Sequence, residues 1–214
     1  MVELLACVAV IAVLVTLVGS QVGQAFDRTK NLKCVSLMRK VGSAIQQYSL
    51  DNNNEFPRSS HSAWSLGKKP WGSAILPYLQ GEESTTVTEA AFAKITRCPA
   101  DKRVGNIIRS YGLNVFFQLG SGDSYVGAPT TWWTYVTVPR PAATILVAEN
   151  NSGADHFMSH EWSSTVGIEN EWAIKRHGKT SNYLFVDGHV ESLPIEAVFD
   201  PAKNINKWNP GLAN

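Results

Sequence analysis

The stretch that decides the fold is Leu4–Val18, LLACVAVIAVLVTLV, which is apolar at every position except Thr16 and follows directly on Glu3. Its fifteen residues would form a helix of roughly 22 Å, shorter than the ~30 Å hydrocarbon core of a bilayer. Small residues up to Ala25 prolong the apolar character. The sequence therefore predicts an apolar helix at residues 1–25, which must be covered by lipid or by other copies of itself.

Three interpretations of this helix compete. A cleaved signal peptide needs a basic start and a small-x-small cleavage site, and Gly23-Gln24-Ala25 supplies only the second. A plain membrane anchor is oriented by nearby basic residues, which here all follow the span and would place the rest of the chain in the cytoplasm. An exported domain would therefore require a basic leader ahead of Met1. In the third interpretation, the helix leaves the membrane and becomes the core of an assembly.

The next block, residues 26–53, continues as helix without a proline. Its apolar positions are spaced four and three residues apart, so one stripe faces a core while basic and amide side chains occupy the other faces. The result is a single helix of about 80 Å whose first half is apolar and whose second half is amphipathic. The run Asp51-Asn52-Asn53-Asn54 and then Pro57 end it. The stripe consists of Cys34, Met38, Val41, Ile45 and Tyr48.

The remaining residues, 54–214, are expected to form a globular domain. Asn182–Leu193, NYLFVDGHVESL, contains two alternating runs around Asp187-Gly188, which is the strongest local pattern for a β-hairpin. This order of elements predicts an α+β fold in which the long helix packs on a small antiparallel sheet. Further strands are expected at 107–117 and 144–149, and short helices at 71–79 and 87–94.

Composition excludes several classes of protein. The 214 residues carry a formal charge of +1 and no long run of like charges, which removes the electrostatic case for a nucleic-acid partner. A hydrophobic content of 44% with seven Trp excludes a disordered chain. Three cysteines without a Cys-x-x-Cys spacing do not match a zinc ribbon. Common catalytic motifs, such as G-x-S-x-G or a Walker loop, do not occur, so the chain is not expected to be an enzyme.

The start of the chain, Val2-Glu3-Leu4-Leu5 and the apolar run after it, resembles the mature N-terminus of type IV pilins and type II secretion pseudopilins. In that family the acid is the fifth residue, which implies two further residues ahead of Met1. The resemblance implies that the carboxylate neutralises the N-terminal ammonium of a neighbouring subunit; the alternative is an interfacial Glu that reaches water. The implied assembly residues are Glu3, Leu4, Leu5, Val8, Ile11 and Leu14.

Motifs in the body of the chain narrow this resemblance. Residues 33–42 and 48–57 are similar to the Cys-x-x-Asn-Leu-Lys-Gln-Ile-Gly and Tyr-x-x-Asp-Asn-x-Gly-x-Phe-Pro patterns of pseudopilin-like proteins in planctomycete and verrucomicrobial genomes, although Ser36 and Leu37 replace the Asn-Leu pair. Residues 98–103 and 110–114 are similar to that group's Cys-Pro-Ser-Asp and Ser-Tyr-x-x-Asn stretches. His177, Asp187 and Gly188 fit its His-x9-Asp-Gly signature.

The resemblance implies a structural subunit of an extracellular type IV pilus-like or pseudopilus filament, which polymerises through its N-terminal helix. Its partners would be other copies of the chain, the inner membrane before assembly, the pilus or secretion assembly machinery and the prepilin peptidase. The location would be the inner membrane and then the extracellular or periplasmic filament. The alternative is a membrane-anchored extracytoplasmic binding domain, with carbohydrate as a possible ligand because of the aromatic stretch 130–135.

An exported domain is in an oxidising compartment, where disulfides persist. Cys34 lies on the core-facing stripe and Cys98 precedes Pro99, so we expect a Cys34–Cys98 bridge and a free Cys7.

Metal ligands are harder to identify from the sequence. Calcium needs several oxygen ligands, which Glu149, Asn150, Asn151 and Asp155 could supply in one loop, and related pseudopilins bind calcium near their C-terminal loops. Glu149 and Asp155 are therefore the calcium candidates. The alternative metal is zinc at Asp155-His156-x3-His160-Glu161, where the two histidines are four residues apart. No further cofactor is expected. The simplest role of Asp187 and Gly188 is to form the turn of the hairpin. The simplest role of His177 is to form a hydrogen bond with the adjoining strand.

Overall fold

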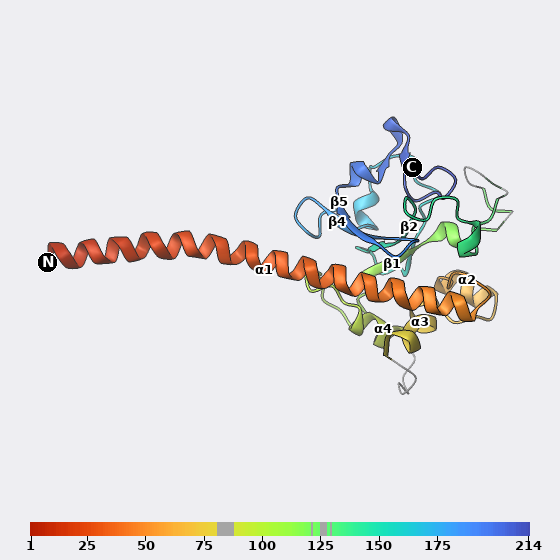
Figure 1. The fold of residues 1–214 in the computed structure, drawn as a ribbon, viewed down its shortest axis with the longest axis horizontal. Helices are drawn as coiled ribbons and strands as arrows, with labels where there is room; N and C mark the ends of the chain where they lie inside the picture. Colours follow the sequence, from red (N-terminus) through yellow and green to blue (C-terminus); the bar gives the residue numbers. More distant parts are fainter. Residues whose placement is uncertain (81–87, 121, 125–127, 129) are drawn as a thin grey trace.

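The computed structural model describes residues 1–80, 88–120, 122–124, 128 and 130–214; for residues 16–21 it describes the backbone alone. The predicted α+β class is confirmed. A long N-terminal helix is joined to a body built on a five-stranded sheet and a two-stranded sheet. Figure 1 shows that the first half of the helix extends away from the body, while the second half runs along it.

The long helix, α1, comprises Val2–Asp51. It ends where Asn53 and Asn54 adopt positive φ angles of 55° and 62°. Asparagine tolerates this left-handed conformation better than most residues, which is why a run of three Asn stops the helix. The turn is fixed by a hydrogen bond from the backbone N–H of Asn54 to the carbonyl of Ser49, 2.8 Å long.

The second half of α1 forms the centre of the core. It contacts α3 (Trp71–Gln80) on one side and strands β4 (Ser181–Phe185) and β5 (Val190–Leu193) on the other. Figure 1 accordingly shows the sheet on one side of α1 and the helices α3 and α4 (Glu89–Ile95) on the other. The predicted stripe provides these contacts, since Cys34, Met38, Val41 and Ile45 are all fully buried.

Strand order in the larger sheet is β3-β1-β2-β4-β5, with β1 at Tyr111–Asn114, β2 at Ile145–Glu149 and β3 at His156–Phe157. All neighbours are antiparallel except β1 and β3, which are parallel. The expected antiparallel sheet is therefore found only in part, because the β1–β3 pair makes the sheet mixed. The chain reverses direction after β2, and β3 then pairs with the other edge of β1. Since β2 runs opposite to β1, the reversed strand β3 runs in the same direction as β1.

The hairpin expected at 182–193 is formed by β4 and β5. Its turn contains Gly188, whose φ is 94°, a conformation that glycine adopts without strain. A Cβ at this position would lie 2.9 Å from the amide nitrogen of Gln46 on α1, so the turn also packs closely on the helix. The Asp187-Gly188 pair is thus explained by backbone geometry and helix contact together.

Shorter elements cover the outside of the body. The helices α2 (Ser60–Ser65) and α4 (Glu89–Ile95) flank α3. The helix expected at 87–94 corresponds to α4, although residue 87 itself lies outside the described residues. The small sheet pairs β6 (Phe199–Asp200) with β7 (Ile205–Asn206). Five 3-10 turns complete the described elements, at Val115–Phe117, Tyr135–Thr137, Ile168–Asn170, Ile195–Ala197 and Pro201–Lys203.

Membrane spans were expected from the apolar first half of α1. Within the described residues, no helix is both long enough and apolar enough to cross a membrane. The last three residues of the stretch Leu4–Val18 belong to the segment 16–21, whose side chains are not described.

Candidate assembly surface and buried signature cluster

The first turns of α1 carry apolar side chains that are open to solvent. Among the residues expected to assemble, Glu3 is exposed in the first turn of the helix. The other five are Leu4, Leu5, Val8, Ile11 and Leu14, which are 72%, 69%, 57%, 59% and 55% exposed. We call the apolar side chains at positions 2–15 of α1 the helix surface.

The helix surface continues around the whole circumference. Successive residues of an α-helix are rotated by about 100°, so Val10 and Val13 lie opposite Leu4 and Val8, and they are exposed as well. In the described part of the chain, the first buried side chain of α1 is Cys34. Monomeric soluble proteins rarely expose a continuous apolar surface of this extent, which marks it as a site of interaction with lipid or protein.

A disulfide joins Cys34 on α1 to Cys98, which follows α4. The two Cα atoms lie 5.1 Å apart, within the usual ~4.4–6.8 Å of protein disulfides. The bridge closes a loop with a sequence separation of 64 residues, which corresponds to about 4 kcal/mol of stabilisation in the loop-entropy model. Cys7, the remaining cysteine, is free and exposed on the helix surface.

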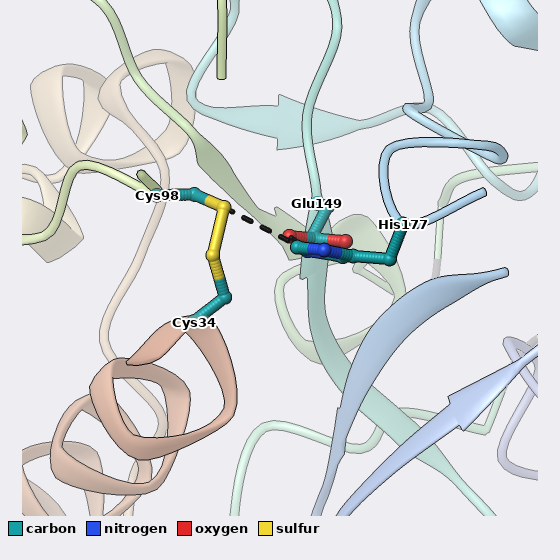
Figure 2. Close-up of side chains that lie close together, drawn as sticks. All are labelled: Cys34, Cys98, Glu149 and His177. Carbon is teal, nitrogen blue, oxygen red and sulfur yellow. Dashed lines mark hydrogen bonds and ion pairs between the residues drawn. A yellow bond between two sulfur atoms is a disulfide. The ribbon is translucent and has the colours of Figure 1, made fainter. Parts of the chain in front are cut away.

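The disulfide belongs to a compact group of side chains that we call the buried cluster: Cys34, Cys98, Glu149 and His177. Figure 2 shows the imidazole of His177 and the carboxylate of Glu149 next to each other, beside the sulfur of Cys98. Its Nε2 is 2.9 Å from Oε1 of Glu149 and 3.7 Å from Sγ of Cys98. The four residues come from α1, the turn after α4, the end of β2 and the loop before β4.

Glu149 is fully buried, and its carboxylate is held from two directions. Oε1 faces His177, whereas Oε2 accepts hydrogen bonds from the hydroxyl of Ser181 at 3.1 Å and the backbone N–H of Asn182 at 2.9 Å. A buried carboxylate without such partners would be strongly destabilising. The sequence pattern gave no reason to pair Glu149 with His177, because the two residues lie on different elements and are far apart in the chain.

The three signature residues lie at the two ends of β4. His177 precedes the strand, and its backbone N–H donates to the carbonyl of Thr180 at 3.1 Å. Asp187 and Gly188 form the turn after it, against Gln46. One end of the signature therefore contacts the disulfide on α1, and the other end contacts α1 about three turns further along.

A second buried network adjoins the cluster. Asp101 accepts hydrogen bonds from Arg103 at 2.6 Å and from the hydroxyl of Ser110 at 2.9 Å, and Arg176 lies 3.3 Å away. Burial opposes ionisation, but the bonds from Arg103 and the charge of Arg176 lower the pKa of Asp101 to about 2. Burial lowers the pKa of Arg176, while the charges of Glu149 and Asp101 oppose this change. The only sequence signal for Asp101 was its place in the motif at 98–103.

The two residues proposed for calcium have separate partners. Asp155 accepts hydrogen bonds from the backbone N–H and hydroxyl of Ser60, at 2.7 and 2.9 Å, and contacts His156 at 2.9 Å. Burial opposes ionisation of Asp155, but its hydrogen bonds with His156 and Ser60 together outweigh this effect and lower its pKa. Glu149 instead belongs to the buried cluster. Within the described residues, this cluster is the one place where three or more His, Cys, Asp or Glu side chains could bind a metal together. Calcium binding at these two residues stays a prediction.

The tryptophans considered as a carbohydrate platform are mostly part of the core. Trp132 and Trp172 are buried, and Trp162 is stacked on Trp172 at a centroid distance of 5.4 Å. Trp133 is 38% exposed, but its indole N–H donates to the carbonyl of Leu119 at 2.6 Å and its ring lies under Arg58. This aromatic stretch therefore does not present a row of open rings.

Comparisons with known proteins add no family to this description. No protein-family model matches the chain, and no significant match was found among curated proteins or solved structures. The candidate function consequently rests on the sequence motifs and on the geometry above.

Proposed function

We propose that the chain is a structural subunit of a type IV pilus-like or pseudopilus filament and has no enzymatic role. The observation that carries the proposal is the helix surface, which is apolar on all sides and projects beyond the body (Figure 1). A single copy of the body covers only the later half of α1. The helix surface therefore needs lipid or neighbouring copies of the same helix.

The energy available from such packing is large. Covering the apolar residues of the helix by neighbours would bury on the order of 1,000 Å², equivalent to roughly 25 kcal/mol at ~25 cal/mol per Å². Association and side-chain ordering oppose this gain by several kcal/mol. The surplus is sufficient for a stable helical core, so the helix drives polymerisation and the bodies decorate the outside of the filament.

The sequence resemblance supplies the remaining parts of the proposal. Before assembly, lipid of the inner membrane covers the helix surface; after assembly, the filament is extracellular or periplasmic. Glu3 neutralises the N-terminal ammonium of a neighbouring subunit and so sets the axial register, because a desolvated ion pair is sensitive to distance. Prepilin peptidase and the pilus or secretion machinery are the expected partners.

A shortened chain that begins at Phe26 tests the proposal. The full chain is expected to give regular helical filaments in electron micrographs. The shortened chain is expected to be monomeric in solution, with the unfolding midpoint of the full chain's body, because its buried residues start at Cys34. Filaments of the same symmetry from the shortened chain would show that the body polymerises. Glycan binding by a monomeric full chain would favour the anchored binding domain instead.

A further inference from the structure

The buried cluster has a composition that the filament role does not explain. Its four side chains offer two sulfurs, one imidazole nitrogen and one carboxylate oxygen, and these atoms all lie within 4.8 Å of one another. Cys34, Cys98 and Glu149 are fully buried, and the side chain of His177 is 5% exposed. A cystine in a protein core normally packs against apolar groups, whereas this one lies against an ionisable pair (Figure 2).

Two thiolates, one imidazole and one carboxylate are all ligand types that zinc uses in proteins. With Zn–S distances of ~2.3 Å and Zn–N or Zn–O distances of ~2.0 Å, the ligand atoms of a tetrahedral site lie roughly 3.3–3.8 Å apart. The separation between Nε2 of His177 and Sγ of Cys98 is 3.7 Å. The separation between Nε2 of His177 and Oε1 of Glu149 is 2.9 Å, somewhat shorter, and all four donor atoms lie within 4.8 Å of one another. Small side-chain shifts, together with separation of the two bonded sulfurs, would bring the donors to the spacing of one tetrahedral ion.

We propose that the buried cluster is a redox-exclusive metal site, which holds one zinc-class divalent cation when Cys34 and Cys98 are dithiols and none when they form the disulfide. A dithiol reductant supplies two electrons and two protons to the disulfide, and is itself oxidised to its cyclic disulfide. Zn²⁺ then displaces one proton from each thiol. The cation binds both thiolates, Oε1 of Glu149 and the deprotonated Nε2 of His177.

The surroundings of the cluster fit this role. The bonds from Ser181 and Asn182 occupy Oε2 of Glu149, so that Oε1 is the oxygen aimed at the cluster. Outer partners of this kind orient metal ligands and raise affinity. Two thiolates, one carboxylate and a divalent cation leave a net charge of −1, and the guanidinium of Arg176, which interacts electrostatically with Glu149, partly compensates it.

A surface cavity lies next to the buried cluster. His177 and Pro99, the residue after Cys98, line a surface cavity of about 550 Å³ beside α1. His177 belongs both to the lining of this cavity and to the buried cluster, so the cavity reaches one ligand of the proposed site. The proposal goes beyond the filament role, since it concerns the redox state of the body and not the helix surface.

Cobalt is the probe for the experiment, because Co²⁺ substitutes for zinc and tetrahedral thiolate ligation gives it strong visible absorption. The full chain in a Cys7→Ser background is unfolded with a dithiol reductant and refolded without oxygen, with and without Co²⁺. We expect one Co²⁺ per chain with thiolate charge-transfer and tetrahedral bands, displacement by Zn²⁺, and a higher unfolding midpoint with the metal. The oxidised chain is expected to bind none.

Two variants assign the ligands. His177→Gln is expected to weaken Co²⁺ binding by more than the roughly 10–100-fold that loss of an outer partner costs, and Cys34→Ser with Cys98→Ser is expected to abolish it. His61→Gln changes an exposed histidine and is the matched control. The proposal is overturned if the oxidised chain or the double serine variant binds equally well. It is also overturned if the dithiol chain takes up no cobalt, or fails to fold when the metal is present.

Discussion

Leu4→Ser in the full chain tests whether the helix surface drives assembly. Leu4 is 72% exposed in the single chain, so most of its apolar surface is available to a neighbouring helix. Full burial of a leucine side chain contributes ~1.5–3 kcal/mol, and most of that would be lost with serine. A loss of about 2 kcal/mol raises the concentration of free subunit in equilibrium with filaments roughly 30-fold, because 1.4 kcal/mol corresponds to a factor of ten.

Leu32→Ser is the matched control, because Leu32 lies on the same helix and is 69% exposed, but alongside the body. The assay is sedimentation of filaments after detergent removal, with the unsedimented subunit measured at several total concentrations. Thermal unfolding of the body should be unchanged in both variants, since neither side chain is buried. Equal effects of the two substitutions, or no effect of Leu4→Ser, would refute the role of the helix surface.

Three further predictions concern other parts of the chain. Glu3→Ala is expected to reduce filament yield in electron micrographs severely while the body unfolds at an unchanged midpoint, and Glu3→Gln should behave alike if the charge matters. Gly188→Ala and Gly178→Ala both place alanine at positive φ and should each lower the free energy of unfolding by roughly 1–2 kcal/mol. Only at Gly188 would the added Cβ also lie against Gln46. A Gln46→Ala change should therefore reduce the loss at Gly188 but not at Gly178. The pKa of Asp101 is lowered in the folded protein, so its ionised carboxylate contributes roughly 2 kcal/mol to stability above pH 4, and this contribution is lost between pH 4 and 2. The free energy of unfolding in urea of Asp101→Asn should therefore depend less on pH in that window than that of the unchanged chain.

Local patterns in the sequence predicted the parts of the fold that are set by local chemistry. The 4-3-4-3 spacing from Cys34 identified the buried face of α1 because a helix repeats every 3.6 residues. Asp187-Gly188 between two alternating runs identified the β4–β5 hairpin, since few other residue pairs form so tight a turn. In both cases the residues that decide the structure are close together in the chain.

Long-range arrangement was not accessible in the same way. Parallel pairing of the two-residue strand β3 with β1 depends on the path of a loop, which leaves no periodic pattern in the sequence. Glu149 was assigned to calcium because acidic and amide residues follow it, whereas its partners lie on β4 and on the loop before it. A carboxylate at the end of a buried strand must find partners across the sheet, and a single sequence does not name them.

The positions of the signature residues connect the body to the proposed assembly. Along α1, Cys34 and Gln46 are separated by roughly 18 Å. The disulfide partner of Cys34, Cys98, contacts His177 at one end of the signature, and Gln46 packs against Gly188 at the other. A shift of the helix by one residue would rotate its faces by about 100°, so two contacts at separate heights fix both its rotation and its height relative to the sheet. The first half of α1 continues the same helix without interruption and inherits that rotation. In the proposed filament, the signature would therefore fix the faces that the helix surface turns toward neighbouring copies, although none of its residues lies on that surface.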